Sequence, residues 1–220
     1  MASALSGVDR KLRWTDFTSV AAPPPITPPP AYPPGAMTDA EINVRGLQLD
    51  VVWLGAPGPF YKIRDSLIVR VSLNPDSWRL ASLSTAPGPD QVWLLKHEQG
   101  HYDIHALLAR DYYQRVRSMM DQPFTNPADA REQLSDHLDA TLRRVEAMNR
   151  DYDATTWGGS KREVQWSWWC AIERARQRHQ SPLARDDFGR LLKDDEGHLL
   201  KVELVDALRS FGLGYIDSVK

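Results

Sequence analysis

Hydrophobic and polar residues alternate along two stretches of the first third of the chain. Ile42 to Leu54 reads Ile-Asn-Val-Arg-Gly-Leu-Gln-Leu-Asp-Val-Val-Trp-Leu, and Ser66 to Leu73 reads Ser-Leu-Ile-Val-Arg-Val-Ser-Leu. A period of two is typical of β-strands that bury one face. Turn-forming residues follow the two stretches, at Gly55 to Pro59 and at Asn74-Pro75-Asp76. The alternation therefore predicts a small antiparallel sheet.

After Pro89 the hydrophobic period lengthens to about 3.6 residues, which is typical of helices. We expect one helix over residues 91–120 with Asp90 as its N-cap, a second from Asn126-Pro127 to about Asn149, and a third from Gly158-Gly159 to about His179. Ser160 and Glu163 have the spacing of a capping box at the start of the third helix. Strands followed by helices indicate an α+β fold.

Composition divides the chain into four parts. Residues 1–22 contain a short apolar cluster that we expect to pack on the main domain, residues 36–182. Between them, residues 23–35 are rich in proline, which fixes φ and removes a hydrogen-bond donor, so we expect an extended connector. Such a tract can also be a ligand for SH3-type domains, but a spacer is the commoner role. Residues 183–220 are interpreted as a C-terminal appendage.

Charge and cysteine content exclude several classes of function. The 220-residue chain has 27 Lys and Arg against 29 Asp and Glu, so no strong field attracts nucleic acid or an anionic membrane. Neither a signal peptide nor a stretch able to span a bilayer is recognisable. With Cys170 as the single cysteine, a transition metal would have to be bound by histidines and carboxylates. No pattern indicates an oligomeric state.

The segment Leu94-Leu-Lys-His-Glu-Gln-Gly-His-Tyr-Asp-Ile104 carries the chemistry that the sequence predicts. Because His97 and His101 are four residues apart, they share a helix face and can bind one cation. Zinc suits imidazole ligands and lowers the pKa of its water, and Glu98 is placed to act as the general base. The alternative interpretation is a pair of satisfied core histidines.

Apolar residues place both histidines on the inward face of this helix. Leu94, Ile104 and Leu108 continue the stripe of the histidines at spacings of three and four. Burial of two imidazoles is costly unless they are paired or bound to a metal, which favours the metal. His105 lies two turns beyond His97, roughly 12 Å along the axis, and is interpreted as a neighbour rather than a ligand. The remaining histidines, His137, His179 and His198, lack a motif.

Several motifs together resemble a bacterial family of unknown function whose members are predicted to be secreted zinc-dependent proteases. They are Leu12-Arg-Trp-Thr-Asp-Phe17, Asp76-Ser-Trp78, the segment from Leu94 to Ile104, Ala109-Arg110, and Tyr152-Asp153 with Thr156, Gly159, Gln165 and Trp168. The resemblance covers about residues 10 to 170. It implies a zincin-like domain in which a small antiparallel sheet is followed by the His-Glu-x-x-His helix and two further helices. It also suggests an exported or periplasmic location, with a cytoplasmic location as the alternative because the chain shows no signal peptide.

The chain departs from this family where a third zinc ligand is expected. The family pattern Tyr-Asp-x-x-Thr-x-His-Gly aligns with Tyr152 to Gly159 and places Gly158 where the histidine would stand. A catalytic zinc ion normally has three protein ligands. Asp153 is the first candidate to replace the histidine and Glu163 the second. Tyr152 is either a donor to a developing oxyanion or a packed loop residue.

The leading hypothesis is zinc-dependent hydrolysis of a polypeptide substrate, with Glu98 activating a zinc-bound water held by His97 and His101. Because of Gly158, an inactive zincin-like binding module is the alternative. A third possibility makes the proline tract the functional element. On the third helix we expect Trp168 in the core, whereas Trp166 and Trp169 lie elsewhere, either packed or as a platform for carbohydrate.

Overall fold

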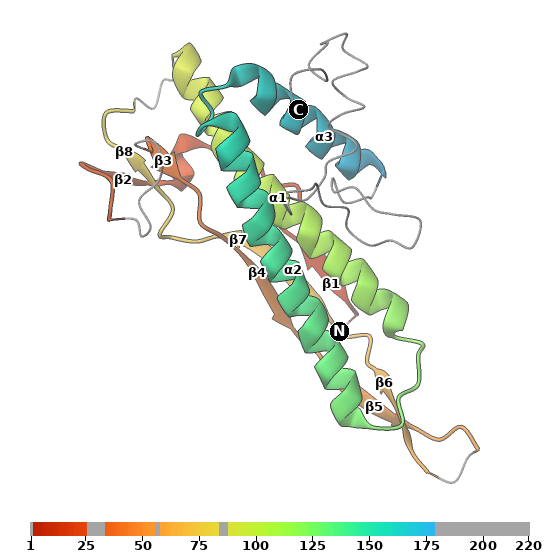
Figure 1. Cartoon of the computed structure of the whole chain (residues 1–220). Helices are drawn as coiled ribbons and strands as arrows, with labels where there is room; N and C mark the ends of the chain where they lie inside the picture. The colour runs from red at the N-terminus through yellow and green to blue at the C-terminus, as the bar shows by residue number, and fades with distance from the viewer. Residues whose placement is uncertain (1, 26–33, 56–57, 84–87, 179–220) are drawn as a thin grey trace.

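The computed structural model describes residues 2–25, 34–55, 58–83 and 88–178 (Figure 1). The appendage expected over residues 183–220 lies outside the described residues, and so does most of the proline-rich connector. Eight strands and a 3₁₀ turn in the described part precede three α-helices, which confirms the α+β fold. No helix in these ranges is long and apolar enough to cross a membrane.

The strands form three small sheets. The first contains β1 (Ala4–Ser6), β7 (Ile68–Leu73) and β4 (Ala40–Arg45), in that order, and the second contains β2 (Thr18–Val20), β8 (Trp78–Leu80) and β3 (Ala36–Met37). The third is a hairpin of β5 (Leu49–Val52) and β6 (Phe60–Ile63). The 3₁₀ turn η1 (Trp14–Asp16) lies between β1 and β2.

The antiparallel pairing of the two alternating stretches is confirmed, because β4 pairs with β7 from Ala40↔Leu73 to Arg45↔Ile68. The expectation of a purely antiparallel sheet is wrong, since β1 joins β7 and β2 joins β8 in parallel. Three-residue strands are too short to show alternation, so the sequence pattern did not reveal them.

The single strand expected from Ile42 to Leu54 is also wrong, because it divides into β4 and β5. Gly46 separates them with a φ of 73°, and a Cβ at this position would lie 2.0 Å from the Ser66 carbonyl oxygen. Only glycine tolerates both conditions. The bend lets β5 leave the first sheet and pair with β6.

The helices are α1 (Pro89–Met119), α2 (Pro127–Thr156) and α3 (Arg162–Arg178). The α1 N-cap is Gly88 rather than Asp90, because Pro89, with its fixed φ, occupies the first helical position. Asp90 lies in the first turn and pairs with Arg162. Asn126 caps α2 as expected, and its side chain accepts a hydrogen bond from the Ala128 N–H at 2.9 Å. The expected end of α2 near Asn149 is wrong, since the helix continues to Thr156.

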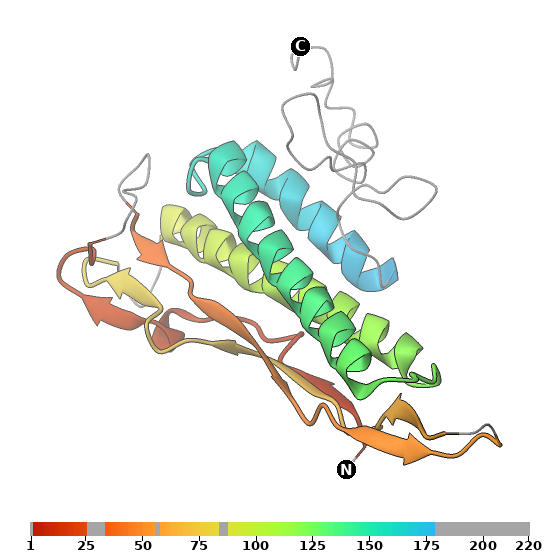
Figure 2. The ribbon, with the colours of Figure 1, turned by 60° about the horizontal axis from the view of Figure 1, so that its bottom comes forward.

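Helix α1 lies between the strands and the other helices. It contacts β4 and β7 on one side and α2 and α3 on the other. Figure 2 shows the strands as a layer on one side of the helices, with α3 on the side away from that layer. The histidine segment is therefore enclosed by elements on several sides.

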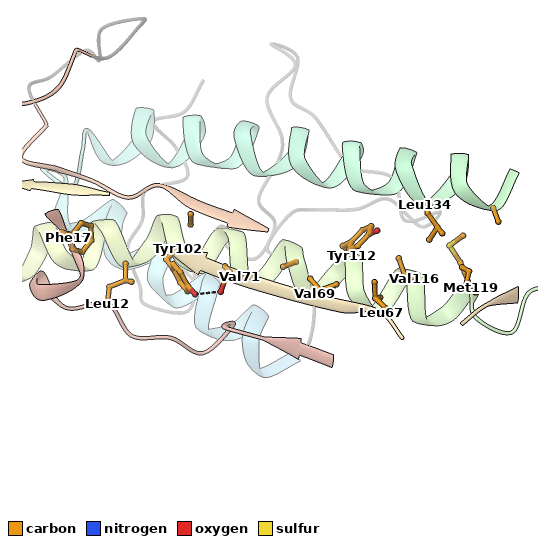
Figure 3. Close-up of a cluster of buried hydrophobic side chains, with 14 of the residues drawn as sticks. Leu12, Phe17, Leu67, Val69, Val71, Tyr102, Tyr112, Val116, Met119 and Leu134 are labelled. Carbon is orange, nitrogen blue, oxygen red and sulfur yellow. Dashed lines mark hydrogen bonds between the residues drawn. The ribbon is translucent and has the colours of Figure 1, made fainter. Parts of the chain in front are cut away.

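Two hydrophobic clusters hold α1 in this place. The first joins it to the sheets through residues such as Val69, Val71 and Val116, and the Tyr102 hydroxyl donates to the Val71 carbonyl at 3.2 Å (Figure 3). The second joins α1 to α2 and α3, and its buried members include Ile104, Leu108, Met148, Trp168 and Ile172. Burial of each such side chain contributes roughly 1.5–3 kcal/mol. The position of α1 is thus fixed from both sides.

Candidate metal centre

His97 and His101 lie on neighbouring turns of α1, on the side that faces α2. The His97 side chain is 4% exposed and that of His101 12%, as the apolar stripe predicts. Their Nε2 atoms are 3.2 Å apart. Two ring nitrogens that face each other so closely require a shared proton or a shared cation between them.

Asp153 on α2 completes a cluster with the two histidines. Its Oδ1 atom lies 3.1 Å from His97 Nε2 and 3.0 Å from His101 Nε2. The extension of α2 beyond Asn149 makes this possible, because it carries Asp153 along the helix to the level of the motif. Among the described residues, these three form the group of metal-binding side chains that converges in this way.

The three atoms suit a transition metal. A tetrahedral zinc ion bound at about 2.0–2.1 Å has ligand atoms about 3.3 Å from one another. The observed separations of 3.0 to 3.2 Å are close to this value. Two imidazoles and one carboxylate are also an unsuitable set for calcium or magnesium, which prefer oxygen ligands. The residues present therefore fit zinc or a similar ion.

The outer nitrogens of both histidines have partners on α2. His101 Nδ1 lies 2.8 Å from Asn149 Oδ1, so this nitrogen donates when the amide oxygen faces it. His97 Nδ1 lies 3.4 Å from the Thr156 hydroxyl oxygen, which donates its own hydrogen to the Tyr152 carbonyl at 2.6 Å. The Thr156 hydroxyl oxygen must therefore accept a hydrogen bond from the His97 Nδ1–H. Both contacts leave a lone pair on Nε2, the atom that faces the cluster.

The Tyr152 ring packs against both histidines of the cluster. It stacks on His97 with centroids 4.8 Å apart and an interplanar angle of 16°, and meets His101 edge to face. The hydroxyl lies against α1 at Gly100, where an added Cβ would be 2.4 Å from it. Burial raises the pKa of Tyr152 well above its usual value, with Glu98 and Asp153 adding to the shift. The ring thus holds the imidazoles in place, while the predicted role in oxyanion binding stays a prediction.

Glu98 is buried beside this cluster without a protein partner for one of its oxygens. The residue is 2% exposed, and its Oε2 atom makes no hydrogen bond to any described residue. Its backbone is held in place, because the Thr38 hydroxyl donates to the Glu98 carbonyl at 3.2 Å. A buried carboxylate oxygen without a donor is costly, so such an oxygen is uncommon in a purely structural role.

Charge is strongly coupled within the cluster. Burial alone would raise the pKa of Asp153, but the hydrogen bonds from both histidines outweigh it and lower that pKa. Burial alone would lower the pKa of His101, but the hydrogen bond and the charge of Asp153 raise it to about 9. Without a cation, the coupling therefore holds the Asp153 carboxylate ionised and keeps His101 protonated up to about pH 9. A bound cation must replace that proton, which makes binding dependent on pH.

The other predicted candidates lie outside the cluster. His105 Nδ1 contacts the His101 carbonyl oxygen at 2.9 Å, and burial lowers its pKa to about 4. Glu163, the second candidate for the third ligand, is exposed in the first turn of α3. Gly158 lies in the turn after α2 with a φ of 57°. Trp168 is buried as expected, 1% exposed.

Asn149 and Thr156 were not among the residues predicted from the sequence to act at the site. The sequence does indicate these two residues, because Asn149, Asp153 and Thr156 follow one another at spacings of four and three, which place them on one face of a helix. Using this spacing required α2 to be recognised as continuous to Thr156.

Comparisons with known proteins give one family match, which covers part of the chain. No curated protein and no solved structure matches the chain. The matching family model, described as a bacterial protein of unknown function (DUF922), covers residues 92–159, the segment that contains His97, His101 and Asp153.

Proposed function

We propose that the protein is a zinc-dependent hydrolase of peptide bonds, with a zincin-like arrangement of the His-Glu-x-x-His helix. The observation that carries the proposal is the convergence of His97, His101 and Asp153 beside the buried carboxylate of Glu98, whose Oε2 atom has no hydrogen-bond partner among the described residues. A carboxylate next to a cation site is the pairing that hydrolysis of an amide requires.

In the proposed reaction, different residues bind the metal, transfer the proton and orient the ligands. His97, His101 and Asp153 would hold the zinc ion, which supplies Lewis acidity for the carbonyl and for the attacking water. Glu98 accepts the proton of the water and returns it to the leaving amine. Asn149 and Thr156 keep the imidazoles in the correct tautomer.

A sheet edge next to the motif supports a polypeptide as substrate. Strand β3 forms one edge of its sheet and is followed directly by Thr38, which contacts the Glu98 carbonyl. An extended peptide can add to such an edge through main-chain hydrogen bonds. The substrate backbone would then run close to the general base.

The test is hydrolysis of denatured polypeptides by the zinc-supplemented protein. We expect cleavage by the wild type, loss on chelation, recovery with zinc, and a loss of at least a hundredfold in Glu98→Gln. Glu98→Gln keeps the shape of the side chain and all three ligands. Equal activity in both proteins, or none in either over a broad set of substrates, would refute the proposal.

The second candidate function is an inactive binding module that keeps the metal. Gly158, at the position where the resembling family has histidine, favours it. It predicts stoichiometric zinc without hydrolysis, whereas the enzyme predicts both. The convergence of Asp153 on the two histidines offers a candidate third ligand despite Gly158 and fits both functions. The buried Glu98 oxygen without a hydrogen-bond partner among the described residues favours the enzyme, because a module that only binds the metal does not need it.

A further inference from the structure

Trp157 has a backbone conformation that large side chains rarely adopt. With φ 49° and ψ 56° it is left-handed, and it is the only non-glycine residue of the described part of the chain with a positive φ. Glycine takes this conformation without strain, whereas a residue with a Cβ does not. The backbone therefore does not explain a tryptophan at this position.

The turn that contains Trp157 packs against His97, one of the candidate ligands. Trp157, Gly158 and Gly159 are all left-handed, and the Lys161 N–H closes the turn on the Thr156 carbonyl at 2.9 Å. Gly159 packs on His97, since a Cβ added there would lie 3.0 Å from the His97 Cβ. Strained residues persist only where their surroundings fix them, and they concentrate at functional sites.

Core packing does not explain the side chain either. Trp157 is 59% exposed, whereas Trp168 in the core is 1% exposed. Its ring contacts the Lys161 ammonium, which lies 4.6 Å from the ring centroid. An exposed tryptophan held by a cation is an amphipathic surface of the kind that binding sites use.

Trp157 lies at the end of α2, the helix that carries the partly exposed candidate ligand Asp153. The Asp153 side chain is 42% exposed while that of His97 is 4% exposed, so solvent reaches the cluster from the side of Asp153. Trp157 is the C-cap of α2 and directly follows Thr156, whose hydroxyl oxygen lies 3.4 Å from His97 Nδ1. A substrate bound across this end of α2 would contact the exposed indole.

We propose that Trp157 determines substrate specificity, its indole receiving an apolar or aromatic side chain of the polypeptide beside the bond to be cleaved. This inference rests on the proposed function. Burial of an aromatic side chain against the indole favours such substrates over those with a small residue at the same position.

The test compares binding of matched peptides that differ at one position, phenylalanine or alanine, scanned along an otherwise constant sequence. Calorimetry is done with zinc-loaded Glu98→Gln, which binds without turnover. We expect a preference for phenylalanine of roughly tenfold at one position, the scale of an interface aromatic. In the Trp157→Gly background we expect the ratio of the affinities for the phenylalanine and alanine peptides to fall to about one. Trp157→Phe should keep most of this ratio, because it retains an aromatic ring.

Two controls separate function from structure. Trp157→Gly should also raise the unfolding midpoint, because glycine relieves the left-handed strain. Trp53→Ala removes another exposed indole, 72% exposed after β5, and should leave the ratio unchanged. A phenylalanine preference that survives Trp157→Gly, or the absence of any preference, overturns the inference.

The outcomes also distinguish this inference from the proposed function. Hydrolysis by the wild type together with an unchanged ratio in Trp157→Gly overturns the role of Trp157 alone. A Trp157-dependent ratio without hydrolysis by the wild type overturns hydrolysis alone.

Discussion

At the scale of single residues, the centre consists of three ligand atoms and the groups that orient them. In the proposed centre Asp153 would contribute the charge, His97 and His101 would each contribute Nε2 in the neutral form, and Asn149 and Thr156 would orient the two rings. Metal affinity depends on both the inner layer, the three ligand side chains, and the outer layer, Asn149 and Thr156. The outer residues matter because they fix the orientation and the tautomer of the imidazole rings. Each layer can be tested by one substitution with a matched control.

The third ligand is tested by removing each candidate carboxylate. Asp153→Ala should leave the protein without stoichiometric zinc after dialysis, because two imidazoles alone hold the ion weakly. Glu163→Ala should retain zinc, since this carboxylate is exposed on α3 and outside the cluster. Zinc content per chain is measured by elemental analysis. If Asp153→Ala retains zinc and Glu163→Ala loses it, the third ligand is Glu163 rather than Asp153.

The outer layer is tested with two adjacent threonines. Thr156→Val removes the acceptor of His97 Nδ1 and should weaken zinc binding by roughly 10- to 100-fold in a chelator competition. Thr155→Val should leave the affinity unchanged, because the Thr155 hydroxyl contacts Trp168 and the α2 backbone rather than an imidazole. Equal losses in both variants would indicate a general effect on folding instead.

At the scale of elements, close packing of α1 against α2 places the ligands. Gly100 allows the Tyr152 ring to lie against α1, and Gly159 allows the turn after α2 to lie on His97. Gly100, the single glycine of the segment from Leu94 to Ile104, thus lets α1 and α2 approach closely at the level of Asp153 and the two histidines. Interiors are packed too densely to absorb an extra methyl group at such a contact.

Gly100→Ala tests this contact against helix propensity. Alanine is normally better than glycine inside a helix by about 1 kcal/mol. Here the added Cβ would lie 2.4 Å from the Tyr152 hydroxyl, so we expect a net loss of about 1–3 kcal/mol in the free energy of unfolding. Urea denaturation measures it. Combining the change with Tyr152→Ala should cost less than the sum of the two single losses; strict additivity would contradict the contact.

Tyr112 offers a test of the packing between α1 and the sheets. Its hydroxyl is buried without a hydrogen-bond partner among the described residues, and burial raises its pKa to about 12. Tyr112→Phe should therefore increase the free energy of unfolding by about 1 kcal/mol at neutral pH. A decrease would show that the hydroxyl has a partner.

The same residue gives a pH dependence with a defined sign. The folded state keeps the Tyr112 proton up to about pH 12, whereas the unfolded chain loses it near the usual pKa of 10.0. Stability that is complete below pH 10 is then lost as the pH rises toward 12, because the unfolded state alone is deprotonated in this window. In Tyr112→Phe the decline over this window should be smaller, as measured by urea denaturation at a series of pH values.

At the scale of the whole molecule, the sequence predicted the order of strands and helices and the motif helix, but not the details that complete the centre. Periodicity identified the pairing partners β4 and β7 and the inward face of α1. It failed at β1 and β2, whose strands of three residues each show no period. It also failed at the end of α2, where Asp151, Asp153 and Ala154 interrupt the apolar pattern although Met148, Tyr152 and Thr156 continue it.

This failure had a consequence for the site. With α2 ended near Asn149, Asp153 was placed in a loop and competed with Glu163 as the third ligand. Only the continuous helix brings Asn149, Asp153 and Thr156 onto the face that meets His97 and His101. Packing of Tyr152, which lies in this last stretch of α2, on Trp168 of α3 stabilises the helix here, rather than local helix propensity.

The most direct test of the metal centre is a crystal structure of the zinc-loaded protein with anomalous scattering at the zinc edge. We predict one strong peak bonded to the Nε2 atoms of His97 and His101 and to Asp153 Oδ1, at distances of about 2.0–2.2 Å. No peak at this position, or a zinc ion bound by other residues instead, would contradict the assignment of these three ligands and the function that depends on them.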